Sequence, residues 1–212
     1  MKHFLLTWYG LTDLRAALGA EDTDGPVLSA LTTGEYTDAI ILAYTDPQKL
    51  VDGLGVGDLS NTAIGHERFS QWLRAKLEAR DVPVTVQVIP HELKHLNDAP
   101  GIYDAAASAV QMALQDPGVK QVTTYVSPGT PVMAYTWALI ARSNPQLSIG
   151  VISTSDPSKP PERIDLPKNL LNSSIGTAGG TATVPREYDV VLHLLGEQTI
   201  PVFFGMRQFQ AG

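Results

Sequence analysis

The feature that most constrains the fold is the alternation of short apolar runs with helix-like segments. Residues 38–44 (DAIILAY) form a continuous apolar run, and residues 84–89 are rich in β-branched side chains. Residues 66–80 instead place Phe69 and Leu73 four positions apart, a spacing typical of one face of a helix. Near-continuous apolar strands that alternate with helices predict an α/β fold, with a mostly parallel sheet and helices on both faces.

The same pattern runs along most of the chain of 212 residues. The predicted strands cover residues 3–8, 38–44, 84–89, 121–126, 147–153 and 189–195, with a short one at 201–204, and the predicted helices cover 11–18, 66–80, 102–115 and 131–142. Residues 166–184 are polar and rich in Gly and Thr, so we interpret them as a surface loop. No linker or repeat divides the chain, which predicts one domain over residues 1–209 and a short tail at 210–212.

Charge and composition narrow the function classes. The net charge is −7 and Lys and Arg form no cluster, which disfavours binding of long DNA or RNA. Binding of a small phosphate-bearing ligand is compatible with this acidic composition, because backbone amides can hold phosphate without positively charged side chains. The chain has no cysteine, no secretory signal and no apolar run near the ~20 residues that cross a bilayer. We expect a cytoplasmic protein that is not inserted in a membrane.

The turn at residues 127–131 (SPGTP) is the first candidate site. It follows an apolar strand and precedes a predicted helix. Thr130 suits a helix N-cap and Pro131 suits the first helical position. Gly129 allows the backbone to approach a ligand closely. Free amides and the helix dipole would then face an anion, although an ordinary strand-to-helix turn has the same pattern.

The segment after the first predicted strand is the second candidate site. Hydroxyl groups at Thr7 and Thr12 can hydrogen-bond, and the rings of Trp8 and Tyr9 can stack on a base. Alternatively, Trp8 belongs to the core and Thr12 or the next residue caps a helix. The candidates here are Thr7, Trp8, Tyr9, Gly10, Thr12 and Asp13. The segment lacks the glycine fingerprint G-x-G-x-x-G, so we expect no NAD and no other cofactor.

Strand order decides whether these two segments meet. In the order 3-2-1-4-5, the first and fourth strands are neighbours where the order reverses. Ligands of open α/β sheets bind outside the carboxyl ends of the strands at this point. Residues 7–13 and 127–131 would both lie there.

Two further motifs have weaker functional meaning. His91-Glu92-Leu93-Lys94-His95 matches the zinc-protease pattern H-E-x-x-H, but it directly follows a predicted strand, and residues 97–101 (NDAPG) end it early. We therefore expect a solvated loop and no metal. Residues 53–57 (GLGVG) follow no strand and lack the Lys-Ser/Thr of a Walker motif, so we interpret them as a surface connection.

From Ser127 through Pro128 and on to Met133, the sequence resembles the CARF family (CRISPR-associated Rossmann fold). Members of this family have a strand, a turn of the form S-P/G-G-T-P-x-M and then a helix. The stretch HLLGEQ at 193–198 and the stretch PVFFG at 201–205 also resemble CARF-containing sensors. The resemblance covers residues 1–209 and implies a Rossmann-like fold.

The resemblance further implies a homodimer that binds cyclic oligoadenylate, the messenger made by type III CRISPR complexes. The ring would lie across the two-fold axis, between residues 7–13 and 127–133 of each subunit. Family members pass the signal to a fused or associated effector, and we expect this chain to be a sensor domain without its effector.

Two alternatives stay open. Some CARF proteins cleave their own ligand, and Thr12, Ser127 and Thr130 offer hydroxyls for such a ring nuclease, although the turn has no Lys or Arg. A similar turn also occurs in the sensor domain of RNA-repair transcription activators, which implies recognition of an RNA end.

Overall fold

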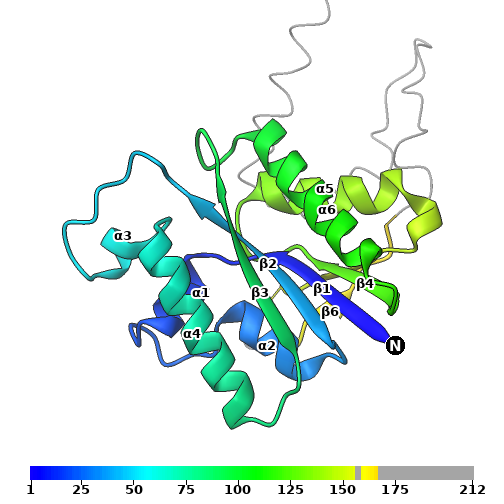
Figure 1. Ribbon diagram of the computed structural model, residues 1–212, viewed down its shortest axis with the longest axis horizontal. Coiled ribbons are helices and arrows are strands. Elements are labelled where there is room, and N and C mark those ends of the chain that lie inside the picture. The colour runs from blue at the N-terminus through cyan, green and yellow to red at the C-terminus, as the bar shows by residue number, and fades with distance from the viewer. Residues whose placement is uncertain (156–158, 167–212) are drawn as a thin grey trace, which may run out of the picture.

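A six-stranded sheet in the order β3-β2-β1-β4-β5-β6 forms the centre of the computed structural model, which describes residues 1–155 and 159–166 (Figure 1). Its strands are β1 (Lys2–Trp8), β2 (Asp38–Thr45), β3 (Thr85–Glu92), β4 (Val119–Tyr125), β5 (Gly150–Ser153) and β6 (Glu162–Arg163). The first five are parallel, and β6 pairs antiparallel with β5. The predicted mostly parallel α/β architecture is confirmed, and the observed order meets the condition 3-2-1-4-5 on which the meeting of the two candidate segments depends.

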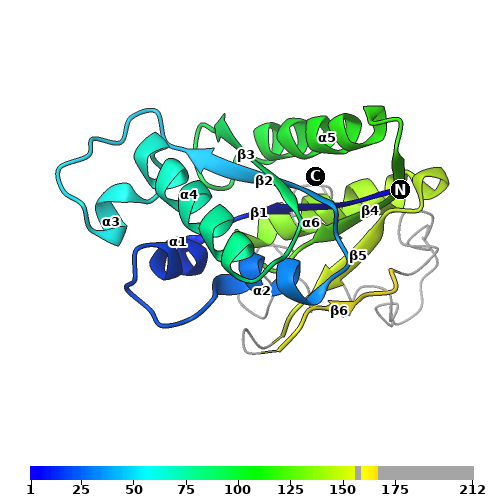
Figure 2. The same cartoon turned by 60° about the horizontal axis from the view of Figure 1, so that its bottom comes forward.

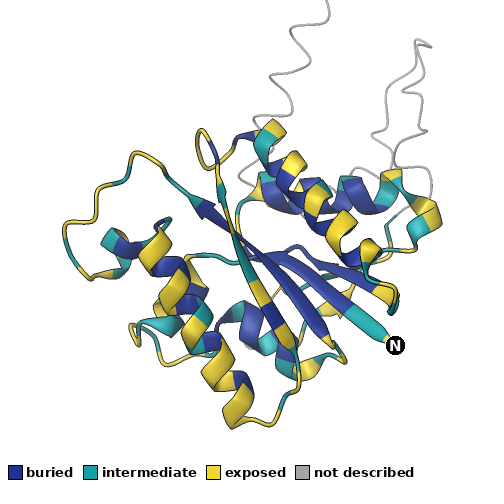
Figure 3. Cartoon of the chain, viewed as in Figure 1, coloured by how far each residue is buried: buried dark blue, intermediate teal, exposed yellow. Residues whose placement is uncertain are grey.

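Helices cover both faces of this sheet (Figure 2). They are α1 (Leu11–Ala17), α2 (Gly25–Thr33), α3 (Val56–Leu59), α4 (Ala63–Ala79), α5 (Ala99–Gln115) and α6 (Pro131–Ser143). Leu6 and Trp8 of β1 point to the face that packs against α5 and α6, whereas Leu5 points to the face that packs against α1, α2 and α4. This alternation explains why the central strands are buried on both sides (Figure 3).

The structure adds short elements that the sequence pattern did not predict. Helices α2 and α3 and strand β6 are new. The strand predicted at 147–153 begins only at Gly150, because Pro145–Leu147 forms a 3-10 turn. The strands predicted at 189–195 and 201–204 and nearly all of the loop at 166–184 lie outside the described residues.

Strand β3 continues through Pro90 and ends at Glu92, whereas the prediction ended it at residue 89. Proline is tolerated there because β3 is the edge strand of the described sheet and pairs only with β2. Within the described ranges, no helix has both the length and the apolar character needed to span a membrane.

Candidate functional site

The loops that follow β1 and β4 touch each other at the carboxyl edge of the sheet. β1 pairs with β2 on one side and with β4 on the other, so the strand order reverses between β1 and β4. A Cβ atom added to Gly10 would lie 3.3 Å from the backbone nitrogen of Gly129. The two segments that the sequence proposed separately therefore meet where open α/β sheets bind ligands.

Gly129 is required by the geometry of the turn itself. Its φ of +96° lies in the region that favours glycine, and an added Cβ would come within 2.7 Å of the Met133 Sδ and 3.3 Å of the Trp8 Cβ. Any side chain here would strain the turn with or without a ligand. A substitution of Gly129 is therefore a poor test of ligand binding.

The first turn of α6 keeps few amides for a ligand. The Met133 N–H donates to the Thr130 Oγ1 at 3.3 Å, and the Thr130 N–H donates to the Met133 Sδ at 3.4 Å. Pro131 has no N–H. Within the described residues, the N–H groups of Gly129 and Val132 have no hydrogen-bond partner, so these two, together with the helix dipole, can face an anion.

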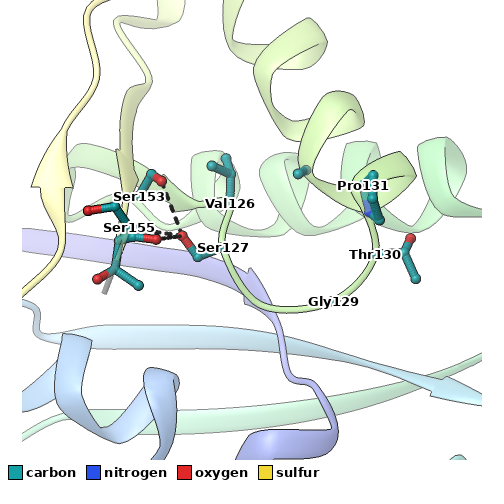
Figure 4. A pocket seen from close by; sticks show the side chains of 9 residues that line it. Val126, Ser127, Gly129, Thr130, Pro131, Ser153 and Ser155 are labelled. Carbon is teal, nitrogen blue, oxygen red and sulfur yellow. Dashed lines mark hydrogen bonds between the residues drawn. The ribbon is translucent and has the colours of Figure 1, made fainter. Parts of the chain in front are cut away.

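Ser127 points toward the end of β5 (Figure 4). Its Oγ accepts the Thr154 N–H at 2.7 Å, and it lies 3.2 Å from the Ser153 Oγ and 3.1 Å from the Thr154 carbonyl oxygen. The Ser127 hydroxyl therefore ties the turn to the next strand. Pro128 beside it is buried.

A cavity of about 370 Å³ opens beside this turn (Figure 4). We call it the serine cavity, and its lining residues are Val126, Ser127, Gly129, Thr130, Pro131, Ala134, Ser153, Thr154 and Ser155. None of these is a Lys, Arg, Asp or Glu. Anion binding by its described walls would thus depend on backbone N–H groups and hydroxyls.

The strand end before Gly10 is part of the core. Thr7 is fully buried and its Oγ1 donates to the Tyr125 carbonyl oxygen at 2.9 Å. Trp8 is also fully buried, and its indole N–H has no hydrogen-bond partner among the described residues. The expectation that Trp8 can stack on a base is therefore corrected, because packing against α5 and α6 leaves its ring no open face.

Thr12 and Asp13 lie in helix α1, and neither lines a described cavity. Thr12 is exposed, whereas Asp13 is 1% exposed. The Asp13 carboxylate accepts the Gly10 N–H at 3.0 Å and the Val27 N–H at 2.8 Å. Burial raises the pKa of Asp13 to about 6, although these two N–H groups oppose the rise. Asp13 therefore joins the starts of α1 and α2, which is a structural role.

A second cavity of about 270 Å³ lies on the β1–β2 side of Gly129 and Thr130. We call it the tyrosine cavity, and it is lined by Tyr9, Gly10, Leu11, Leu14, Tyr44, Ser60, Asn61, His66, Leu96, Gly129, Thr130 and Met133. One face of the Tyr9 ring stacks on Phe69, with 4.1 Å between ring centroids. The two cavities share Gly129 and Thr130, so the turn forms a wall of both.

His66 is the only titratable imidazole in the described wall of the tyrosine cavity. Its Nδ1 is hydrogen-bonded to the Tyr9 hydroxyl, and its Nε2 lies 3.0 Å from the Thr45 Oγ1. Burial lowers the pKa of His66 to about 4, so the ring is neutral at physiological pH. With both nitrogens engaged, His66 holds the end of β1 against α4.

Sequence analysis missed several cavity residues, which are Tyr44, Ser60, Asn61, His66, Leu96 and the segment 153–155. They lie at or after the carboxyl ends of β2, β3 and β5, and no local motif marks them. The signal available in the sequence was topological, because carboxyl ends of parallel strands share one edge of the sheet.

The H-E-x-x-H match does not form a metalloprotease helix. His91 and Glu92 are the last residues of β3, which corrects the expected solvated loop, and Leu93, Lys94 and His95 lie beyond the strand. Across residues 1–155 and 159–166, no group of three His, Cys, Asp or Glu side chains is arranged to hold a metal ion. Residues 53–55 lie between β2 and α3, but Val56 and Gly57 are the first two residues of α3, so the interpretation of 53–57 as a surface connection holds only for its first three residues.

Comparison with known proteins supports the fold. No protein-family model matches the sequence, and no curated protein matches it. Among solved structures, the chain is similar to Csm6 of Enterococcus italicus bound to cyclic hexa-2'-fluoro-hexa-dAMP, with a TM-score of 0.56 and 14% sequence identity. The similarity covers 93% of this chain and 40% of that protein, so the chain spans less than half of its length.

Proposed function

We propose that this domain binds a cyclic oligoadenylate at the carboxyl edge of β1 and β4. The observation that carries the proposal is the pair of cavities that share the turn at Gly129 and Thr130. One cavity offers hydroxyls and backbone N–H groups to a phosphate, and the other offers rings and apolar walls. The fold is shared with a protein whose structure was solved with a cyclic hexanucleotide, which favours a ring ligand.

We further propose that two copies bind one ring across a two-fold axis and control a fused or associated effector in type III CRISPR defence. A closed ring of identical units presents the same group twice, so one loop from each subunit can meet it. Within the proposed site, Tyr9, Gly10, Gly129, Thr130, Pro131 and Met133 contact the ligand. Thr7, Asp13, Ser127 and Pro128 support them from behind.

Binding without cleavage fits the described walls best. In-line cleavage of a ribose–phosphate bond is accelerated by cations and other groups that stabilise the developing charge. No described residue of the serine cavity is cationic, and the Ser127 hydroxyl is engaged with β5. The experiment below must therefore distinguish binding from cleavage by a ring nuclease. It must also distinguish binding of a ring from recognition of an RNA end.

Calorimetric titration with cyclic tri-, tetra- and hexa-adenylate, and with linear tetra-adenylate as the control, tests the proposal. We expect one of the rings to bind with the stoichiometry of one ring per two chains and the linear control to bind more weakly. Linear product after long incubation would instead show ring-nuclease activity. Binding of a modified RNA end without binding of any ring would refute the proposal.

A further inference from the structure

The tyrosine cavity has the size and chemistry of a site for one uncharged heterocycle. Its volume of about 270 Å³ lies just below the range of about 300–1,000 Å³ for sites that hold drug-sized ligands. Leu11, Leu14, Leu96 and Met133 supply apolar walls, and the described lining holds no charged group, because His66 is neutral. A phosphate held here would contact no cationic residue of the described lining, since the nearby Lys49 Nζ already donates to Gly57 and Ser60, so a base fits better.

Asn61 stands out among the polar groups of this cavity. Its carboxamide makes no hydrogen bond with any described residue, although Asn61 is only partly exposed. Its backbone is in the left-handed region, with φ of +59°. By contrast, the Ser60 hydroxyl is already held by Lys49, and both nitrogens of His66 are engaged.

The surrounding loop holds Asn61 in place. The Asp46 N–H donates to the Asn61 carbonyl oxygen at 2.9 Å. The Lys49 Nζ donates to the carbonyl oxygens of Gly57 at 2.6 Å and Ser60 at 2.7 Å, and to the Ser60 Oγ at 2.8 Å. A side-chain ammonium thus fixes the residue before Asn61, and this restricts the positions that the carboxamide can reach.

We propose that Asn61 is a specificity-determining residue, whose carboxamide reads the edge of one adenine in the tyrosine cavity. This rests on the proposed function. A carboxamide pairs with adenine in a bidentate way, because its oxygen accepts from the 6-amino group while its NH₂ donates to a ring nitrogen. The turn at Gly129 and Thr130 forms part of the same cavity wall, so one nucleotide of the ring can contact the turn with its phosphate and Asn61 with its base.

The variant Asn61→Gly removes the carboxamide and keeps the backbone, since glycine accepts a positive φ without strain. Ser148→Gly is the matched control, because Ser148 is also a non-glycine residue with positive φ (48°) and lies before β5, outside both cavities. Thermal unfolding of both variants shows whether the fold is kept.

The readout is the ratio of affinities for cyclic tetra- or hexa-adenylate and for the same ring built with purine, which lacks the 6-amino group. We expect wild type and Ser148→Gly to prefer the adenine ring by about tenfold, since the purine ring leaves the carboxamide oxygen without a partner. In Asn61→Gly this ratio should fall close to one.

An equal loss of affinity for both rings in Asn61→Gly, or an unchanged ratio, would overturn the role of Asn61 while leaving the proposed function intact. If wild type binds neither ring, the proposed function fails and this inference fails with it. The two failures are therefore distinguishable in one set of titrations.

Discussion

Pro131→Glu should weaken binding of a cyclic oligoadenylate without unfolding the protein. Pro131 is exposed, is the first residue of α6 and lines the serine cavity. The described lining of that cavity carries no charge, so the variant introduces a single carboxylate where the proposal puts a phosphate.

The size of the effect follows from Coulomb's law. At a separation of about 6 Å, two negative charges repel by about 0.7 kcal/mol in water and by about 3 kcal/mol at an effective dielectric constant near 20. Since 1.4 kcal/mol corresponds to a factor of ten, the affinity should fall by about 3- to 100-fold.

The stability of the fold should hardly change in this variant. An acidic residue in the first turn of a helix stabilises it by about 0.3–1 kcal/mol. Loss of the proline costs a similar amount, about 0.4–1 kcal/mol, because the unfolded chain gains freedom. The two effects nearly cancel, so the Tm should stay within about 3 °C of wild type.

Calorimetric titration at low and high salt provides the assay. Gln121→Glu is the control, since it adds the same charge at an exposed position near the start of β4, at the opposite edge of the sheet. The penalty in Pro131→Glu should shrink in 1 M salt, where the Debye length is about 3 Å. If Pro131→Glu binds as tightly as Gln121→Glu, the reasoning that places a phosphate at this turn is refuted.

Three further predictions follow from the geometry and the proposed ligand. Light scattering should give a mass of two chains, and a monomer both with and without ligand would count against the shared ring site. Because burial raises the pKa of Asp13 to about 6, its contribution to the free energy of unfolding should fall by about 3 kcal/mol as pH rises from 4 to 6, while the lowered pKa of His66 contributes in the opposite direction. Urea unfolding of wild type and Asp13→Asn isolates the Asp13 contribution: the stability of wild type relative to Asp13→Asn should fall across this window, and a constant difference would contradict this role. His91→Ala and His95→Ala should leave stability and ligand affinity almost unchanged, and the purified wild-type protein should hold no stoichiometric zinc; zinc found in the wild type and lost on His91→Ala would overturn this.

The wild-type salt dependence is a check on the same electrostatic argument. Few lysine or arginine side chains are available to displace counterions from a bound ring, so the logarithm of affinity should fall only shallowly with the logarithm of salt concentration. A steep slope, comparable with that of a lysine-rich binder, would indicate cationic contacts outside the described walls.

The sequence predicted the sheet because burial leaves a local pattern. The run at 38–44 is apolar at nearly every position since β2 is covered on both faces, and the spacing of Phe69 and Leu73 reports one buried face of α4. The turn residues Thr130 and Pro131 likewise carry their own signal, because capping acts within three or four residues.

The burial of Trp8 and the position of Asn61 in a cavity wall were decided only by the tertiary structure. Trp8 lies at a strand end where a ring can stack on a ligand or join the core, and helices that are distant in sequence decide the outcome by covering it. Asn61 follows an ordinary surface loop, and it reaches the turn at Gly129 only because β1, β2 and β4 end at one edge of the sheet. Periodicity and capping are local and can be read along the chain, whereas a cavity is formed by loops whose distance in space depends on strand order.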